Sequence, residues 1–341
     1  MTSSAFQRVA LASRPEGTPT VGNFRLETGS IPSVPETGLL LRTFYLSLDP
    51  YMRGRMGDRE SYAPAVAIGE VMSGESVAEV IESNHAGYAR GDLVLARTGW
   101  QTHAISDGKG LRKLDPKGAP ITTGLGVLGM PGFTAWSGLT LIGKPKPGET
   151  VVVAAASGPV GSLVGQLAKR AGARAVGIAG GREKCRYLLD ELSLDAAIDH
   201  RATKFPEQLA AACPNGIDVY FENVGGAVWR AVLPLLNQFA RIPVCGLIAQ
   251  YSGAAPSDRD YLPETMRAIL TLSLTLRGFI NYEFAEEHFE SFLRAVTPGV
   301  IAGSIKYRED ITRGLESAPE AFIGMLRGEN FGKALIDLAV A

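Results

Sequence analysis

The sequence predicts an α/β protein that combines a doubly wound parallel sheet with a second, β-rich domain. Four observations carry this prediction. From about residue 150 onward, continuous apolar runs alternate with helical patterns. Before residue 128 the chain is rich in glycine, proline and short strand-like runs, and a turn of small residues joins the first long apolar run to a helix. The 341 residues are enough for two domains.

The first 128 residues are predicted to be mostly β-structure. Turn sequences such as Arg90-Gly91-Asp92 separate short apolar runs, and the runs most typical of strands are Gly38–Leu48, Gly69–Ile81 and Asp92–Ala96. Glycine accounts for 40 of the 341 residues. This excess indicates many tight turns and places where the backbone approaches a ligand closely.

After the turn-forming stretch Gly143–Glu149, strands and helices are expected to alternate, as in a parallel sheet covered on both faces. The predicted strands are Val151–Ala155, Ala173–Ala179, Ala196–Asp199, Ile217–Phe221, Ala240–Cys245 and Leu274–Ile280. The predicted helices are Val160–Arg170, Glu183–Glu191, Glu207–Ala212, Ala227–Leu236, Pro263–Leu272 and Phe284–Val296. The polar, turn-rich tail does not continue this alternation.

Charge and composition exclude several classes of partner. Thirty-four basic and 35 acidic residues leave a net charge of -1, so we expect no nucleic-acid partner and no attraction to an acidic membrane surface. No window has the roughly 18 uncharged apolar residues of a membrane span. Cys185, Cys213 and Cys245 form no CxxC pair, which favours a reducing cytoplasm.

The most informative motif, AAASGPVG at Ala154–Gly161, follows the first strand of the predicted parallel sheet. Ala156, Gly158 and Gly161 have the spacing of G-x-G-x-x-G, with alanine in place of the first glycine. In such a turn Gly158 lets backbone N–H groups approach a pyrophosphate, and Gly161 permits close packing of helix against strand. The strand–turn–helix–strand context therefore predicts a dinucleotide site.

The end of the second strand of that sheet predicts which dinucleotide binds. An NAD site usually has Asp or Glu there to bind the ribose hydroxyls, whereas this chain has Gly180-Gly181 followed by Arg182 and Lys184. A carboxylate would repel a 2′-phosphate, and these cations suit it. The sequence thus favours NADP(H) over NAD(H).

A metal site is not expected. Zinc needs three or four converging Cys, His or carboxylate ligands. The histidines, at His85, His103, His200 and His288, are scattered, and no two of them stand four residues apart. These residues argue against a zinc alcohol dehydrogenase.

Six segments together resemble one known family over essentially the whole chain: LSLDPYMRGRM at Leu46–Met56, LGMPGFTAW at Leu128–Trp136, AAASGPVG at Ala154–Gly161, FENVGG at Phe221–Gly226, PVCGLIAQY at Pro243–Tyr251 and GENFGK at Gly328–Lys333. They are similar to the zinc-independent medium-chain reductases, and within these to the NADPH-dependent double-bond reductases. That group includes prostaglandin reductase, plant alkenal reductases and bacterial curcumin reductase. The details SGPVG, AGGREKC and Asp199-His200 look most like the bacterial curcumin-reductase branch.

The resemblance implies a split catalytic domain, in which residues 1–128 and 298–341 form a GroES-like β fold and residues 129–297 form the Rossmann domain. It implies NADPH as cofactor, with Lys184 on the 2′-phosphate and Gly158–Gly161 on the pyrophosphate. His200 stands where the prostaglandin-reductase branch has a tyrosine at the adenosine end. The remaining implied contacts are Met130, Thr134, Pro159, Val160, Gly180, Asn223, Cys245, Gly246, Leu247, Tyr251, Phe279, Ile280, Asn281, Asn330 and Gly332.

The expected reaction is reduction of the C=C bond of an α,β-unsaturated ketone or aldehyde, with hydride added at the β-carbon and a proton at the α-carbon. The developing enolate needs a hydrogen-bond donor, and a neutral tyrosine hydroxyl suits this role. The candidates are Tyr251, Tyr62 and Tyr51. Arg53 and Arg55 are expected to form interdomain ion pairs rather than to bind substrate.

Two alternatives use the same cofactor: a quinone oxidoreductase, and a non-catalytic NADPH-binding protein. The loops expected to build the substrate pocket are Met56–Pro64 and Ser252–Pro263. A homodimer is also expected, because the apolar strand within Thr271–Ile280 would form an edge of the parallel sheet that invites pairing across a two-fold axis.

Overall fold

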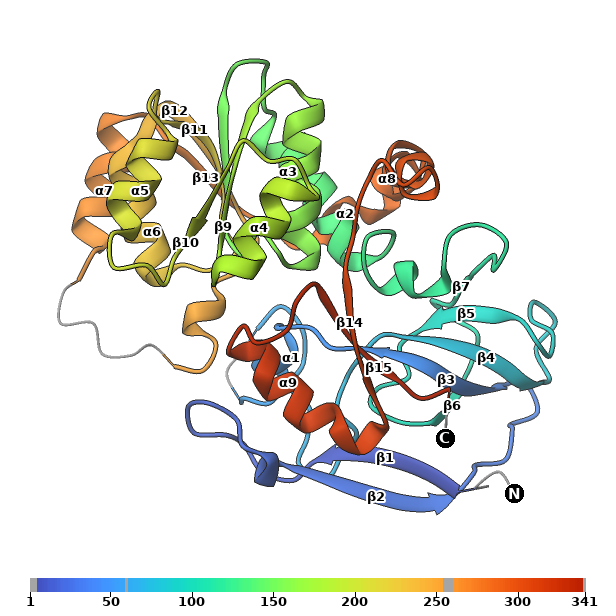
Figure 1. The fold of residues 1–341 in the computed structure, drawn as a ribbon. Helices are drawn as coiled ribbons and strands as arrows, with labels where there is room; N and C mark the ends of the chain where they lie inside the picture. Colours follow the sequence, from blue (N-terminus) through green and yellow to red (C-terminus); the bar gives the residue numbers. More distant parts are fainter. Residues whose placement is uncertain (1–4, 59–60, 254–259, 340–341) are drawn as a thin grey trace. The chain divides into compact units, whose positions relative to one another are not determined.

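The six strands predicted after residue 150 form one parallel sheet with the order β10-β9-β8-β11-β12-β13 (Figure 1). This order reverses direction between β8 and β11, as in a doubly wound dinucleotide-binding fold. Val151, Val152 and Val153 of β8 are almost fully buried because helices cover both faces of the sheet. The strands are β8 Thr150–Val153, β9 Arg174–Ala179, β10 Ala196–Asp199, β11 Ile217–Phe221, β12 Leu236–Val244 and β13 Thr275–Gly278.

Helices α5, α6 and α7 pack on one face of this sheet, and α3 and α4 cover the other (Figure 1). On the first face Leu209 and Val232 join a core with Val152 and Val176. The helices of this part are α2 Met130–Ser137, a π-helical turn Gly138–Gly143, α3 Pro159–Arg170, α4 Arg182–Asp190, α5 Phe205–Ala212, α6 Gly226–Val232, α7 Leu262–Thr271 and α8 Ala285–Ile301.

The connection between β11 and β12 differs from its prediction. The helix expected over Ala227–Leu236 ends at Val232, and a 3-10 turn follows at Leu233–Leu235. Pro234 explains the early end, because it lacks the N–H that would continue the helical ladder. Strand β12 consequently starts at Leu236, four residues before the predicted start at Ala240.

The first part of the chain forms a separate β-rich unit, which the tail joins. Its larger sheet has the order β14-β15-β3-β4-β5-β7, with β6 also paired to β3, and β1 and β2 form an antiparallel pair. Tail strand β15 pairs with β3, which explains why the tail leaves the βα alternation. The elements are β1 Ala5–Leu11, β2 Phe24–Ser30, β3 Leu39–Ser47, α1 Met52–Arg55, β4 Ser76–Ser83, β5 Leu93–Ala96, β6 His103–Ser106, β7 Arg112–Lys113, β14 Glu309–Arg313, α9 Ala318–Leu326 and β15 Lys333–Asp337.

One predicted strand of this unit is shorter than expected. Of Gly69–Ile81, only the part from Ser76 onward is in β4, and Val71 makes an isolated bridge to Ala10. The core of the unit joins distant segments: Trp100 stacks on Phe24 at a ring distance of 5.5 Å and meets Phe322 of α9 edge-on, also at 5.5 Å. The tail is therefore part of the hydrophobic core.

This computed structural model describes residues 5–58, 61–253 and 260–339. Its two compact units meet in the sequence at 125/126 and 308/309, whereas the expected boundaries lie at 128/129 and 297/298. The second expected boundary falls inside α8, which runs to Ile301. Within the described residues, no helix is both long and apolar enough to cross a membrane.

Candidate active site

The glycine turn between β8 and α3 has the geometry that a pyrophosphate site requires. Helix α3 begins at Pro159, and its N-cap is Gly158, which has no side chain to occupy the N–H groups of the first turn. A Cβ at Gly161 would lie 2.5 Å from the carbonyl oxygen of Ala155 and 2.7 Å from the Cα of Ala156. Only glycine at position 161 allows α3 to begin this close to the strand.

The end of β9 forms a second subsite, here called the phosphate corner: Gly180, Lys184, His200 and Arg201. A Cβ at Gly180 would lie 2.9 Å from Nε2 of His200 and 3.0 Å from Nε of Arg201. Glycine thus makes room for two basic side chains from the end of β10. Lys184 is half-buried in the first turn of α4.

The carboxylate nearest to the phosphate corner is already engaged by backbone. Asp199 Oδ1 accepts hydrogen bonds from the N–H groups of Gly181 and Arg201, both at 2.9 Å. Although partial burial opposes them, these donors lower the pKa of Asp199. Partial desolvation, and next the neighbouring Arg201, lower the pKa of His200. The donors of the corner are therefore Lys184, His200 and Arg201, which fit a 2′-phosphate, while the Asp199 carboxylate is held by two backbone amides.

Sequence reasoning missed Arg201, although it follows His200 directly. Its proximity to Gly180 depends on β10 lying beside β9, with Asp199 paired to Ala179. The available signal was a basic residue just after a predicted strand end, at the edge where ligands of parallel sheets bind.

Two further strand ends are joined by hydrogen bonds to backbone carbonyls. Asn223 Nδ2 donates to the carbonyl of Ala154 at 2.8 Å, which ties the end of β11 to the glycine turn. The N–H groups of Cys245 and Gly246 donate to the carbonyl of Glu222 at 2.9 and 3.1 Å. The predicted residues Asn223, Cys245 and Gly246 therefore lie along one edge of the sheet.

The loop after β12 is organised by Tyr251. Its hydroxyl accepts a hydrogen bond from the N–H of Leu247 at 3.3 Å, and a Cβ at Gly246 would lie 2.9 Å from this hydroxyl oxygen. Burial raises the pKa of the Cys245 thiol to about 12. Because the thiolate is the reactive form, the raised pKa disfavours nucleophilic chemistry at this cysteine.

The predicted residues of α2 and of the segment after β13 also meet. Thr134 is buried, and its hydroxyl donates to the Met130 carbonyl at 2.8 Å. The Asn281 side chain donates to the same carbonyl at 3.4 Å. Phe279 is buried, its N–H donates to the Val244 carbonyl at 3.3 Å, and Ile280 follows it. The structure thus connects these residues to the end of β12.

Two of the three candidate tyrosines lie together in the first unit. The guanidinium of Arg55 is 4.4 Å from the ring centroid of Tyr62 and 5.8 Å from that of Tyr51. Burial, and next Asp49, raise the pKa of Tyr51 well above its usual value of 10, so its hydroxyl stays protonated. We call Tyr51, Arg55 and Tyr62 the Arg55 cluster.

Within the described part of the first unit, Arg53 and Arg55 bind backbone carbonyls rather than carboxylates, and the interdomain ion pairs stay a prediction. Arg53 donates to the carbonyls of Pro15 and Gly17, the latter at 2.7 Å. Arg55 donates to the carbonyl of Ala63. All of these partners belong to the first unit.

Asn330 and Gly332, the remaining predicted cofactor residues, belong to the first unit. Asn330 Nδ2 donates to the carbonyl of Gly332 at 2.8 Å, and Gly332 has a φ of +95°, which favours glycine. Next to them, Lys333 Nζ is buried and contacts Asp49 Oδ1 at 2.8 Å and the Leu48 carbonyl at 2.6 Å. The tail is thereby fixed to the segment that leads into α1.

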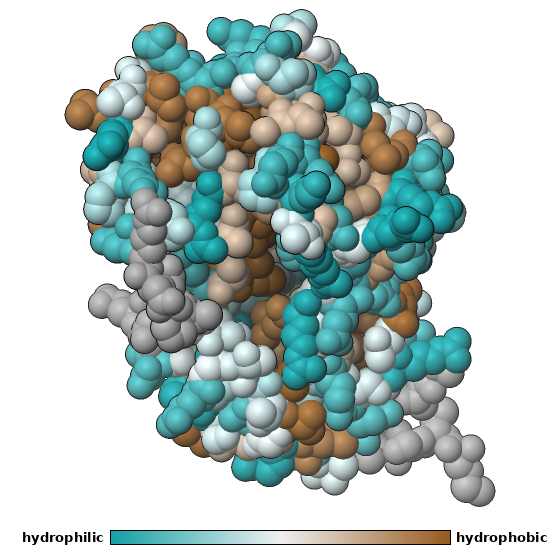
Figure 2. All heavy atoms as spheres, turned by 60° about the vertical axis from the view of Figure 1, so that its left-hand side comes forward, coloured by the Kyte–Doolittle hydropathy of each residue, from teal (hydrophilic) through white to brown (hydrophobic). Residues whose placement is uncertain are grey.

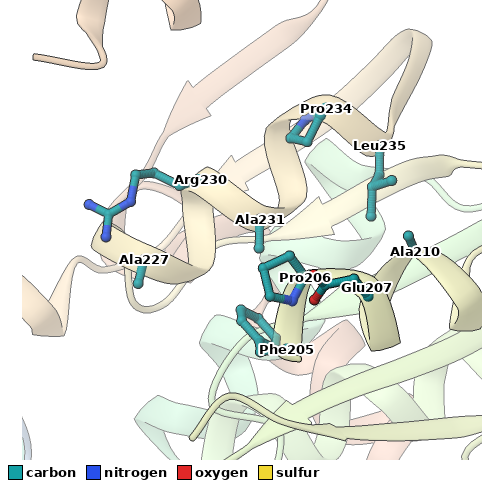
Figure 3. A pocket seen from close by; sticks show the side chains of 9 residues that line it. All are labelled: Phe205, Pro206, Glu207, Ala210, Ala227, Arg230, Ala231, Pro234 and Leu235. Atoms are coloured by element: carbon teal, nitrogen blue, oxygen red, sulfur yellow. The ribbon is translucent and has the colours of Figure 1, made fainter. Parts of the chain in front are cut away.

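The described residues also bear on metal binding and on a further surface groove. Across 5–58, 61–253 and 260–339, no three His, Cys, Asp or Glu side chains form a group that could hold a metal ion. A surface groove of about 480 Å³ lies between α5 and α6, where side chains such as Pro206 and Ala231 point toward one another (Figure 3). It includes none of the predicted site residues. Of the expected substrate loops, residues 59–60 and 254–259 lie outside the described residues.

The sheet order, the glycine turn and the phosphate corner define a class: a dinucleotide-binding α/β protein with an additional β-rich unit. Comparisons with known proteins agree. A family described as "N-terminal domain of oxidoreductase" matches residues 7–114, and one described as "zinc-binding dehydrogenase" matches residues 159–297.

Similar proteins narrow this class. The chain is 53% identical over 334 residues to the NADPH-dependent curcumin reductase of Escherichia coli, covering 98% of this chain and 97% of that protein. It is 41% identical over 325 residues to prostaglandin reductase 1 of Mus musculus, covering 94% and 95%. The solved structure of CurA in complex with NADPH from Vibrio vulnificus has 51% identity and a TM-score of 0.93, covering 97% of this chain and 98% of that chain. The chain belongs to the NADPH-dependent double-bond reductases among the medium-chain dehydrogenases/reductases.

Proposed function

We propose that this chain is an NADPH-dependent reductase of the C=C bond of α,β-unsaturated ketones and aldehydes. The observation that carries the proposal is 53% identity along nearly the whole chain to a protein named as an NADPH-dependent curcumin reductase. The glycine turn and the basic phosphate corner support the cofactor, because both fit a phosphorylated dinucleotide.

The second unit supplies the groups that would hold the cofactor. The first turn of α3, from Gly158 through Pro159 and Val160 to Gly161, would face the pyrophosphate, and Lys184, His200 and Arg201 would face the 2′-phosphate. Met130 and Thr134 would lie against the nicotinamide, where NADPH, when bound, supplies a hydride. The backbone N–H groups in the first turn of α3 suit pyrophosphate binding because they need little reorganisation when the cofactor binds.

A tyrosine is proposed to donate a hydrogen bond to the enolate oxygen as charge develops there. Tyr251 lies in the loop after β12, where its hydroxyl accepts from the N–H of Leu247, and a tyrosine hydroxyl is both a donor and an acceptor. Tyr62 has half of its surface exposed and lies beside the Arg55 cation. Tyr51 remains protonated because its pKa is raised by burial. We rank Tyr251 first and retain Tyr62 and Tyr51 as candidates.

The activity is tested by following NADPH oxidation with three groups of acceptors: alkenals, enones of increasing bulk up to diarylheptanoids, and quinones. Product analysis distinguishes C=C from C=O reduction. We expect saturated ketones and aldehydes as products. Faster turnover of quinones than of every enone would favour the quinone oxidoreductase alternative. Cofactor binding without turnover of any acceptor would favour the non-catalytic alternative.

The role of Tyr251 is tested by Tyr251→Phe. We expect turnover of a saturating enone to fall about tenfold or more, with nearly unchanged NADPH affinity, because the lost donor acts mainly in the transition state. Tyr88→Phe is the matched control, since among the described residues the Tyr88 hydroxyl donates to the Gly108 and Leu111 carbonyls of the first unit. Unchanged turnover of Tyr251→Phe would remove Tyr251 from the donor role.

We also propose that two copies of the chain associate through β13 and α7. Strand β13 ends the parallel sheet, and its one partner among the described strands is β12. Leu262, Met266 and Leu270 form a stripe along α7 and are 62%, 56% and 80% exposed. Figure 2, which brings the left-hand side of Figure 1 forward, shows hydrophobic residues among hydrophilic ones on this face. Such a stripe beside a sheet edge is typical of an association surface.

Light scattering of Met266→Glu tests the association, with Leu189→Glu on α4 as control, because Leu189 is also exposed but lies on another helix. We expect a dimer for the wild type and the control and a monomer for Met266→Glu. A dimer in all three would place the interface elsewhere.

A further inference from the structure

Arg55 is a buried cation whose surroundings are unusual. Arg55 is only 6% exposed. Among the described residues, no carboxylate lies within 4 Å of its guanidinium. A buried charge is costly unless other groups compensate it. Here the compensation comes from the ring faces of Tyr62 and Tyr51 and from the Ala63 carbonyl.

These contacts hold one particular stretch of chain. The Arg55 side chain binds the Tyr62 ring and the carbonyl of the next residue, Ala63. The Arg55 carbonyl in turn accepts a hydrogen bond from the N–H of Val66 at 2.8 Å. Side chain and backbone of a single residue therefore fix both ends of the segment from Tyr62 to Val66.

Arg53 provides a contrast inside the same short helix. It is 8% exposed, so it is as buried as Arg55, and it also donates to backbone carbonyls. Its partners, Pro15 and Gly17, belong to a different segment, and no ring contact joins it to Tyr51 or Tyr62 among the described residues. The two arginines share a helix and a degree of burial but hold different parts of the unit.

We propose that Arg55 is a positioning residue for the reductase reaction, which holds Tyr62 and the segment to Val66 in the arrangement that receives the unsaturated carbonyl substrate. This inference rests on the proposed function. A cation over the face of a phenol ring draws electron density from the ring, so the Tyr62 hydroxyl becomes a stronger donor toward a substrate oxygen. Arg55 acts through Tyr62 and does not itself touch the substrate.

The test compares Arg55→Gln with Arg53→Gln, each in the wild-type and in the Tyr62→Phe background. We expect Arg55→Gln to lower kcat/KM for an enone about tenfold, mainly through KM of the enone, with KM of NADPH unchanged. In the Tyr62→Phe background the same change should cost less than about twofold, because residues in contact act non-additively. Arg55→Lys should recover part of the loss, since it keeps a cation over the ring.

A second measurement does not depend on catalysis. Hydrogen exchange of the amides from Tyr62 to Val66 should accelerate in Arg55→Gln and remain as in the wild type in Arg53→Gln. Equal loss of kcat/KM from Arg55→Gln in both backgrounds, or identical behaviour of the two arginine variants, would overturn the inference alone. A wild-type protein that reduces no enone would instead overturn the proposed function and the inference that rests on it.

Discussion

The phosphate corner of the second unit and the Arg55 cluster of the first unit are built in different ways. In the phosphate corner, His200 and Arg201 follow β10 directly and Lys184 lies in the first turn of the helix after β9, and the two neighbouring parallel strands bring these residues together. In the Arg55 cluster, the helix that carries Arg55 begins shortly after Asp49. Asp49 binds the buried Lys333, which lies 284 residues further along the chain. The first arrangement depends on local strand order and the second on contacts between distant segments.

The largest expected effect is the loss of stability in Lys333→Met, a variant of the first unit. Removing the lysine leaves Asp49 buried without its cation, so we expect the free energy of unfolding to fall by about 3–5 kcal/mol. Lys169→Met is the control: its ion pair with Asp195 in the second unit is partly exposed and should contribute at most about 1 kcal/mol. Urea unfolding measures both, and similar losses would mean that the long-range pair does not dominate the first unit.

Gly161→Ala tests how strictly the second unit depends on its glycine turn. The added Cβ meets backbone atoms at 2.5 and 2.7 Å, so we expect a loss of about 1–3 kcal/mol in stability and weaker NADPH binding. Gly165→Ala, in the same helix, is the control, because the three atoms nearest to a Cβ there belong to the Leu194 side chain, at 3.0 to 3.3 Å, and none of them is backbone. Calorimetry of NADPH binding should distinguish the two variants, and equal affinity would show that the turn tolerates a methyl group.

Lys184→Ala tests the phosphate corner. We expect the preference for NADPH over NADH to narrow about tenfold, because one charge-assisted contact to the 2′-phosphate is lost. Arg186→Ala, on the same helix, is the control, since Arg186 is exposed and pairs with Asp190. The measurement is kcat/KM with each cofactor. Equal loss with both cofactors would show that Lys184 does not recognise the phosphate.

The smallest expected effect is on the pH dependence of stability, and it involves His103 of the first unit and His200 of the second. Partial desolvation lowers the pKa of His103 and of His200, with smaller contributions from Arg42 and Arg201. The unfolded chain therefore takes up these protons first, and stability is lost as pH falls below about 6.5. His103→Asn and His200→Asn should each flatten this dependence slightly between pH 7 and 5. Unfolding curves that keep the wild-type slope would contradict the assignment.

The sequence predicted the sheet of the second unit well, because apolar periodicity and strand-helix alternation are local properties of the chain. It also singled out Gly158, Gly161 and Gly180. Of these, Gly161 is the position where an added Cβ would meet backbone atoms at 2.5 and 2.7 Å. It missed Arg201 and did not foresee the backbone carbonyls that Arg53 and Arg55 bind, because the partner of a side chain is set by packing.

The sequence by itself indicated the class of fold, because the alternation of apolar strands and helices is visible along the chain. It also indicated the dinucleotide turn and Lys184, because each lies within one strand–turn–helix segment. Only the tertiary structure decided that Arg55 contacts Tyr51 and Tyr62, and that Lys333 reaches Asp49. A buried charge must find compensation wherever the fold provides it. Which distant segment does so becomes fixed only when the core of the first unit is packed.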